Sequence, residues 1–254
     1  MREIWETPFG NAALKIERAE KHISDIEQRL LTANDAYELR MGIHADTGKQ
    51  FLYCGVAEES RHIRGHLALM IGDAIHNLKC ALDIAWADTI QRVSPAGHNR
   101  ETKFPVRSNL HDLESVLTKT AKVDATSPLF DFMVNRLGSY DANKGGDFFV
   151  WAIHRLDIHD KHQLLIPVLN ILAIDGVELE HEDGTIGDLT VVLTGPIPYQ
   201  REVPLGTKLK KNGQASFQVR FRDGITAEGR DVVPTLKQFV QQTKRVVRSL
   251  QRIR

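Results

Sequence analysis

The chain has 254 residues, with 33 Lys or Arg and 33 Asp or Glu, so its formal net charge is zero. Hydrophobic residues make up 42% and charged residues 26%, an ordinary globular composition that excludes disordered and fibrous proteins. No run approaches the roughly 18 apolar residues of a membrane helix, and the first residues lack the apolar stretch of a signal peptide. With only Cys54 and Cys80 as cysteines, we expect free thiols and a cytoplasmic protein without a membrane partner.

The zero net charge conceals an uneven distribution along the chain. From Leu205 to Arg254, twelve Lys or Arg stand against three Asp or Glu, so this region carries +9 and residues 1–204 carry −9. A basic end of this kind often contacts nucleic acid, phosphate or an acidic protein surface. Alternatively, it neutralises the acidic body of the same chain, and the sequence leaves both interpretations open.

Hydrophobic spacing predicts helices in the first two-thirds of the chain. Residues 11–35 repeat apolar side chains every three or four positions, as a long helix does. Alternation on either side of the turn Asp46-Thr47-Gly48 predicts a β-hairpin at 37–56. Further helices are predicted over 58–91, 110–120, 128–137 and 147–163.

After Pro167 the pattern changes to short β-like runs separated by Gly, Pro, Asn and Asp. These runs predict a small antiparallel sheet, and they cover 166–174, 189–194, 202–208 and 215–221. Residues 234–252 then predict an amphipathic helix with one apolar and one basic face. We therefore expect a single α+β domain over 1–254, with a mainly helical sub-region at 1–165 and a sheet plus basic helix at 166–254.

Polar side chains concentrate in two of the predicted helices. On the 58–91 helix, apolar side chains fill one arc, and a polar stripe lies nearly opposite. The stripe contains His62, His66, Asp73, His76, Asn77, Cys80 and Asp83. The 147–163 helix contains His154, Asp157, His159, Asp160, Lys161 and His162. Six of the eleven histidines lie in these two segments, and histidine serves as acid, base or metal ligand near neutral pH, so the clustering predicts a site.

Three interpretations of these segments stay open. In the first, His62 and His66 chelate a metal one helical turn apart, with Asp73, His76 or His154 completing the site. Nothing in the spacing fixes those further ligands, so we predict neither a metal nor a cofactor. In the second, the segments form a buried polar network that fixes the packing of the two helices.

The third interpretation is acid–base chemistry on a phosphate group. A histidine would act as base, either His76 or His154. A lysine, Lys79 or Lys161, would stabilise the developing negative charge. An aspartate would orient the histidine, and Asp157 and Asp160 are the candidates.

Three motifs are distinctive: Ile71-Gly-Asp-Ala-Ile-His-Asn-Leu-Lys-Cys-Ala-Leu-Asp83 followed by Trp86, then Thr102-Lys-Phe-Pro105, then Leu156-Asp-Ile-His-Asp-Lys-His162. Together they resemble a family of uncharacterised bacterial and phage proteins, over about residues 11–167. In that family the first motif runs Gly-Asp-x-x-His-Asn-Leu-Arg-Ser-Ala-Leu-Asp-His, and the last is built on Asp-Lys-His.

The first motif of that family is in turn similar to the Arg-x4-6-His pattern of HEPN domains. These are helical modules that often act as dimeric, metal-independent ribonucleases in defence and toxin systems. The resemblance implies a HEPN-like core at 1–165, a homodimer and an RNA substrate. This chain has Lys79 where the pattern has Arg, and Ile84 where it has His. The resemblance therefore implies a degenerate pair, in which lysine keeps the charge but loses the bidentate guanidinium and His76 is a substitute for the lost histidine.

Two functions follow as expectations. In the first, the chain acts on RNA or another phosphodiester without a metal ion. Its catalytic candidates are His76, Lys79, Asp83, His154, Asp157, Asp160, Lys161 and His162. In the second, the chain is a non-catalytic module that binds nucleic acid or an acidic protein partner through its basic end. Its binding candidates are Asn77, Lys237, Lys244, Arg245 and Arg248.

Overall fold

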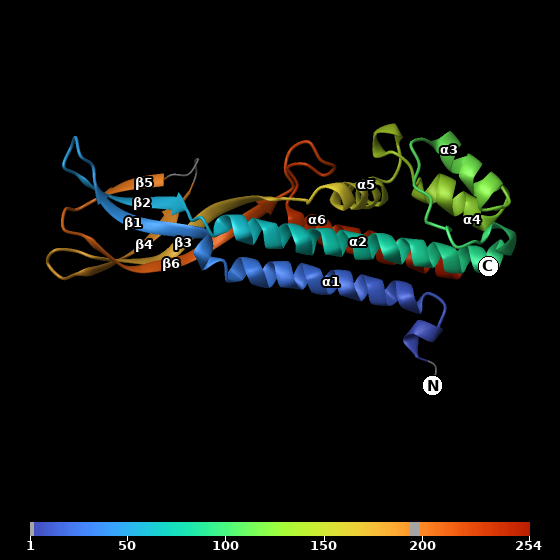
Figure 1. The fold of residues 1–254 in the computed structure, drawn as a ribbon, viewed down its shortest axis with the longest axis horizontal. Helices are drawn as coiled ribbons and strands as arrows, with labels where there is room; N and C mark the ends of the chain where they lie inside the picture. The colour runs from blue at the N-terminus through green and yellow to red at the C-terminus, as the bar shows by residue number, and fades with distance from the viewer. Residues whose placement is uncertain (1–2, 194–198) are drawn as a thin grey trace.

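The computed structural model describes residues 3–193 and 199–254. Figure 1 shows an elongated molecule with helices at one end and β-strands at the other, and with both chain ends at the helical end. Among the described residues, no helix is both long and apolar enough to span a membrane.

Three long helices form the core of the helical end: α1 (Gly10–Leu31), α2 (Ser60–Val93) and α6 (Val232–Arg252). α1 and α6 both run alongside α2 and also contact each other (Figure 1). Because α1, α5 and α6 all pack against α2, more of its surface is covered than its apolar arc alone predicts. Two polar side chains of α2, Asn77 and Lys79, are consequently buried.

Shorter helices follow α2 in the chain. α3 (Leu110–Ser115) and α4 (Pro128–Asp131) each continue into a π-helical segment, at Val116–Thr120 and Phe132–Leu137. α5 (Phe148–His162) begins where the Asp147 carboxylate accepts the Val150 N–H at 2.8 Å, a standard N-cap. The predicted helices are thus all present.

The strands form two three-stranded antiparallel sheets. The first sheet has the order β1 (Tyr37–Ile43), β2 (Gln50–Val56), β5 (Tyr199–Val203). The second has the order β4 (Ile186–Val192), β3 (Val168–Glu180), β6 (Lys208–Arg220). The α+β class and the hairpin at 37–56 are therefore confirmed.

The later strands differ from the prediction in their pairing and in their bounds, since β3 continues to Glu180 and β6 already begins at Lys208. They do not form one separate sheet, because β5 leaves them and pairs with β2 of the hairpin. The predicted strand 202–208 ends at Val203, since Pro204 lacks an N–H and Gly206 adopts a φ of +82° in a turn. Thr194, the last residue of the predicted run 189–194, lies outside the described residues.

The two ends of the molecule have separate hydrophobic cores. One joins the helices, and the other lies between the sheets around side chains such as Leu52, Ile174 and Val191. These units interleave along the chain: the early hairpin packs with the later strands, and α6 returns to the helices. The chain boundary between 1–165 and 166–254 is therefore not a boundary in space.

Gly48 and Gly213 both have left-handed backbone, but only Gly213 lacks space for a side chain. Replacing each by alanine therefore distinguishes the cost of backbone strain from the cost of overpacking. Gly213 in β6 has a φ of +72°, and a Cβ there would lie 2.4 Å from the carbonyl oxygen of Asp175. Gly48 in the hairpin turn has a φ of +64° and open space around it. We expect Gly48→Ala to lower the free energy of unfolding by about 1 kcal/mol, and Gly213→Ala by about 3 kcal/mol. Urea denaturation measures both, and equal losses would contradict the packing argument.

Candidate functional site

The structure divides the candidate residues on α2 and α5 into two groups. Lys79, Asp83 and His154 gather at a pocket, where Lys79 and His154 line the wall. His76 and Asp157 form a second group by direct contact, together with Lys161. The predicted meeting of the two helices is therefore observed, but it creates two local environments.

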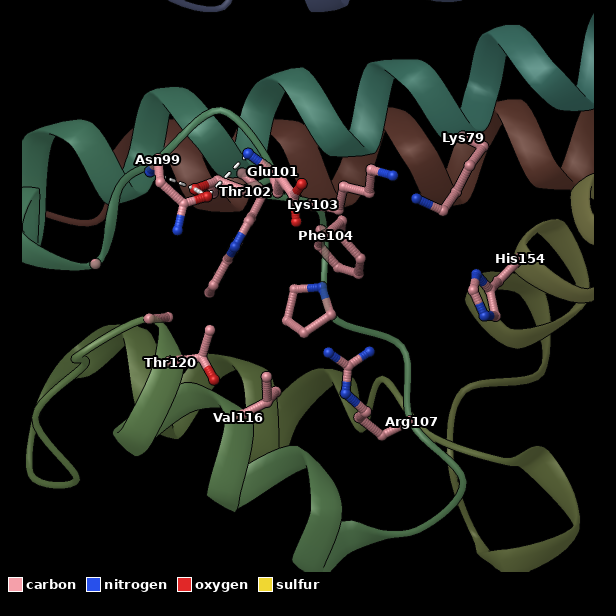
Figure 2. Close-up of a pocket in the computed structure, with 14 residues that line it drawn as sticks. Lys79, Asn99, Glu101, Thr102, Lys103, Phe104, Arg107, Val116, Thr120 and His154 are labelled. Carbon is pink, nitrogen blue, oxygen red and sulfur yellow. Dashed lines mark hydrogen bonds between the residues drawn. The ribbon is translucent and has the colours of Figure 1, made fainter.

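The pocket has a volume of about 320 Å³ and lies between α2, the loop that follows it and α5. Figure 2 shows the side chains of Lys79, Lys103 and Arg107 extending toward the same space, with His154 at its side. These four side chains come from three segments that are distant in the sequence. Thr120, at the end of the π-helical segment after α3, also contributes a hydroxyl group.

Asp83 holds the loop in place over α2. Its Oδ1 accepts the backbone N–H of Phe104 at 2.8 Å and also contacts the Lys79 ammonium. The Phe104 ring packs edge-on against Trp86, with 5.9 Å between the ring centroids. Asp83 was predicted to be catalytic, but its carboxylate is engaged by groups of the protein itself and shapes the pocket instead of facing it.

Lys79 lies close enough to His154 for its charge to act on the imidazole. Lys79 is only 7% exposed, and Asp83 is its ion-pair partner. Burial, and then the charge of Lys79, lower the pKa of His154 from 6.5 to about 4. The Nδ1 of His154 is buried and has no hydrogen-bond partner within the described chain. His154 is thus neutral at pH 7 and has an unused polar atom.

The second group is a chain of contacts centred on Asp157. The carboxylate of Asp157, 3% exposed, accepts from Nδ1 of His76 at 2.8 Å and from Nζ of Lys161 at 2.6 Å. The other ring nitrogen of His76, Nε2, lies 3.4 Å from Sγ of Cys80. Asp157 is therefore in hydrogen-bonding contact with His76, which is the geometry that an orienting aspartate requires.

Two further candidates on α5 lie outside both groups. The carboxylate of Asp160 packs against α2 at Gly72, where a Cβ would come within 2.3 Å of Oδ2. Burial raises the pKa of Asp160. His162 lines a different pocket, together with Arg155 and His159. These two candidates do not join the phosphate-type site because their positions on the helix turn them away from it.

No metal-binding group is evident in the parts of the chain that the structure describes: nowhere do three His, Cys, Asp or Glu side chains gather around one point. His62 and His66, the pair considered as chelators, are exposed on the first turns of α2. The geometry therefore gives no support to the metal interpretation.

The residues predicted to bind nucleic acid are also dispersed. Asn77 connects α1 to α2, accepting from Nζ of Lys15 at 3.3 Å and donating to the Asp73 carbonyl at 2.7 Å. On α6, Lys237 pairs with Glu27 at 2.6 Å, and Lys244 pairs with Glu20 at 2.7 Å. The intramolecular alternative is thus observed for both lysines.

The two remaining basic candidates of α6 have different surroundings. Burial raises the pKa of Asp147, and the nearby charge of Arg245 acts in the opposite direction. Arg248 lines a groove between α6 and α1, which also contains Glu17 and Glu20. Acidic side chains therefore accompany these cations as well.

Two cations of the pocket, Lys103 and Arg107, were missed by sequence reasoning. Lys103 stands inside the Thr102-Lys-Phe-Pro105 motif, so the motif did contain a signal. Arg107 lies two residues beyond it, and only the fold of the loop brings its guanidinium to the pocket. The sequence signal for both cations was the motif Thr102-Lys-Phe-Pro105 in the loop that follows α2.

Comparisons with protein-family models, with curated proteins and with solved structures find no match to this chain. The function must therefore be inferred from the geometry of the chain itself. The HEPN resemblance remains an expectation that rests on the motif around Lys79.

The low pKa of His154 predicts a pH-dependent stability. Because the folded-state pKa is about 4 and the unfolded value is 6.5, protons bind the unfolded chain more readily between these values. This part of the stability is present above pH 6.5 and is lost as the pH falls toward 4. From pH 7 to pH 5, we expect the wild type to lose about 2 kcal/mol more than His154→Gln does.

Urea denaturation at several pH values measures this difference. His98→Gln is the matched control, because His98 is exposed and lies on the loop beside the pocket. The control should follow the wild type. Identical pH dependence of His154→Gln and wild type would contradict a buried, neutral His154.

Proposed function

We propose that the pocket binds the phosphate group of RNA and that the chain cleaves the phosphodiester bond without a metal ion. The observation that carries this proposal is the convergence of Lys79, Lys103 and Arg107 on one pocket beside the neutral His154. Glu101 contributes an acidic side chain to the same lining, so the cations outnumber the acids by three to one.

The free cations explain why an anion would bind there. Within the described chain, neither Lys103 nor Arg107 has a carboxylate partner; Arg107 donates to the Val106 carbonyl at 2.9 Å. A guanidinium presents two parallel donors to a phosphate, and an ammonium adds a point charge. The charge of Lys79 is shared with Asp83, so its contribution is smaller. Arg107 is therefore the main anchor.

His154 supplies the acid–base function. It is unprotonated at neutral pH, and a bound phosphate would raise its pKa from about 4 toward the working pH. His154 would accept the proton of the ribose 2′-hydroxyl as that oxygen attacks phosphorus and the bond to the 5′-oxygen breaks. Arg107 and Lys103 would stabilise the added negative charge. The 5′-oxygen leaves with a proton from water.

In this proposal, the cation and the histidine of the HEPN pattern are provided by different residues from those of the pattern. Lys79 keeps the cationic position, while Ile84, at the place of the histidine, packs against the hydrophobic core. His154 on α5 takes over the missing imidazole from a second helix. We include a homodimer in the proposal, as the resemblance implies, and a cytoplasmic setting, as the two free cysteines predict.

The alternative, a binding module on the basic C-terminal helix, has less support. Lys237 and Lys244 are neutralised by acids of α1, so less of their charge is available to a partner. The pocket, in contrast, combines cations without carboxylate partners and a concave shape.

Binding is tested by fluorescence anisotropy with a labelled single-stranded RNA at one fixed salt concentration, since salt changes such affinities strongly. We expect Arg107→Gln to raise Kd about tenfold, equivalent to about 1.4 kcal/mol, and Lys103→Gln to raise it less. Arg40→Gln on β1 and Lys49→Gln in the turn between β1 and β2, both distant from the pocket, are matched controls and should change Kd less than about twofold. Unchanged affinity in Arg107→Gln would contradict the pocket as the RNA site.

Cleavage is tested separately, by gel analysis of the same RNA in the presence of EDTA. We expect His154→Gln to slow cleavage about 100-fold or more while leaving Kd nearly unchanged, because general-base catalysis contributes that much. Cleavage that disappears in the wild type on adding EDTA would contradict the metal-independent mechanism. Cleavage by His154→Gln at the wild-type rate would exclude His154 as the base.

A further inference from the structure

A thiol, an imidazole and a carboxylate form a line of contacts outside the phosphate pocket. Cys80 Sγ lies 3.4 Å from Nε2 of His76, and Nδ1 of the same ring lies 2.8 Å from Oδ1 of Asp157. None of these three side chains lines the pocket. We propose that Cys80 is a nucleophile activated by His76, and that this group transfers acyl groups from small esters or thioesters.

The helix and its neighbour fix the order of the three groups. His76 and Cys80 are one turn apart on α2, so their side chains lie on one face. A carboxylate only accepts hydrogen bonds, so Nδ1 of His76 carries a hydrogen atom and donates this hydrogen bond to Asp157. The lone pair of Nε2 then faces the thiol. Many acyl-transfer sites contain a nucleophile, a base and a residue that orients the base, arranged in this spatial order.

The site is accessible from solvent. The side chain of His76 is 50% exposed, and Cys80 is partly exposed. The other cysteine, Cys54, is fully buried between the sheets, where burial raises its pKa to about 11. The chain thus contains one accessible thiol beside a base and one shielded thiol for comparison.

The thiol needs that base. Burial raises the pKa of Cys80, and the charges of Asp83 and Asp157 raise it further. Lys15 and Lys79 act in the opposite direction. Cys80 therefore meets its substrate as a protonated thiol, and its reaction depends on transfer of the proton to His76.

The proposed step is balanced within the group. Sulfur of Cys80 bonds to the acyl carbon while the thiol proton moves to Nε2 of His76, and the bond from that carbon to the leaving oxygen or sulfur breaks. The leaving group departs with the proton from His76, or it leaves as a stable anion and His76 releases that proton to solvent. Water then attacks the acyl-thioester while Nε2 of His76 accepts its proton, and His76 returns this proton to the departing sulfur, which restores the thiol.

A side-chain cation would have to stabilise the oxyanion in this step. The N–H groups in the middle of α2 are used in the helix, so they cannot form an oxyanion hole. Lys15 is the candidate, because its charge acts on the Cys80 thiol and its Nζ donates to Asn77 at 3.3 Å. A single ammonium stabilises an oxyanion less than two backbone amides do. We therefore expect reactive esters and thioesters as substrates.

The experiment uses p-nitrophenyl acetate with the full chain. We expect a burst of about one p-nitrophenolate per chain, and peptide mass mapping should place one acetyl group on Cys80. Cys80→Ala should abolish the burst, and His76→Asn should slow it about 100-fold, since His76 is exposed enough to be replaced without unfolding. Cys54→Ala and Arg107→Gln are controls that should leave the burst unchanged. A burst that survives in Cys80→Ala, or an unchanged rate in His76→Asn, would overturn the proposal.

Asp157 acts through His76, so it is a positioning residue and needs its own readout. The 15N NMR signals of the His76 ring in the wild type should show Nδ1 protonated and Nε2 unprotonated. Asp157→Asn should move the proton to Nε2 and slow acylation to about the level of His76→Asn. Because loss of the buried carboxylate also affects folding, the wild-type spectrum decides the matter: protonated Nε2 there would exclude this orientation.

Discussion

The carboxylate of Asp83 is the contact on which the pocket depends. It binds the backbone of Phe104 and the ammonium of Lys79, so one side chain both attaches the loop to α2 and compensates a buried charge. A buried charge that loses its partner costs about 3–5 kcal/mol, far more than an exposed ion pair contributes. Phe104, packed against Trp86, adds an apolar anchor for the loop that delivers Lys103 and Arg107.

A second buried carboxylate, Asp157 of α5, orders the neighbouring polar stripe of α2. Asp157 fixes His76, which lies one turn before Cys80, and Asp83 fixes Lys79, which lies one turn before it. At 100° per residue, positions 76 and 80 share one stripe, while 79 and 83 share the stripe beside it. One helix can therefore present a thiol–imidazole pair to solvent and an ammonium to a pocket.

Local patterns were sufficient for the helices and the first hairpin, less so for the later strands, and not for the contacts between elements. The helix predicted at 147–163 is observed as α5, Phe148–His162, because its cap and apolar spacing are properties of adjacent residues. The pairing of β5 with β2 joins strands about 150 residues apart, and no local pattern encodes it. The same limit applies to the site: Arg107 was missed, and His162 was grouped with Asp157 although five helical residues turn it about 140° away.

The charge asymmetry shows why the total charge of a region is a poor guide to where anions bind. The basic face of α6 is large, but exposed pairs such as Lys244 with Glu20 contribute less than about 1 kcal/mol each, and their main effect is to cancel charge locally. The pocket has fewer cations, yet Lys79 is almost removed from solvent and Arg107 has no carboxylate partner in the described chain. Electrostatic attraction strengthens as water is excluded, so the proposed phosphate site would depend on these few charges and not on the larger number on the helix surface.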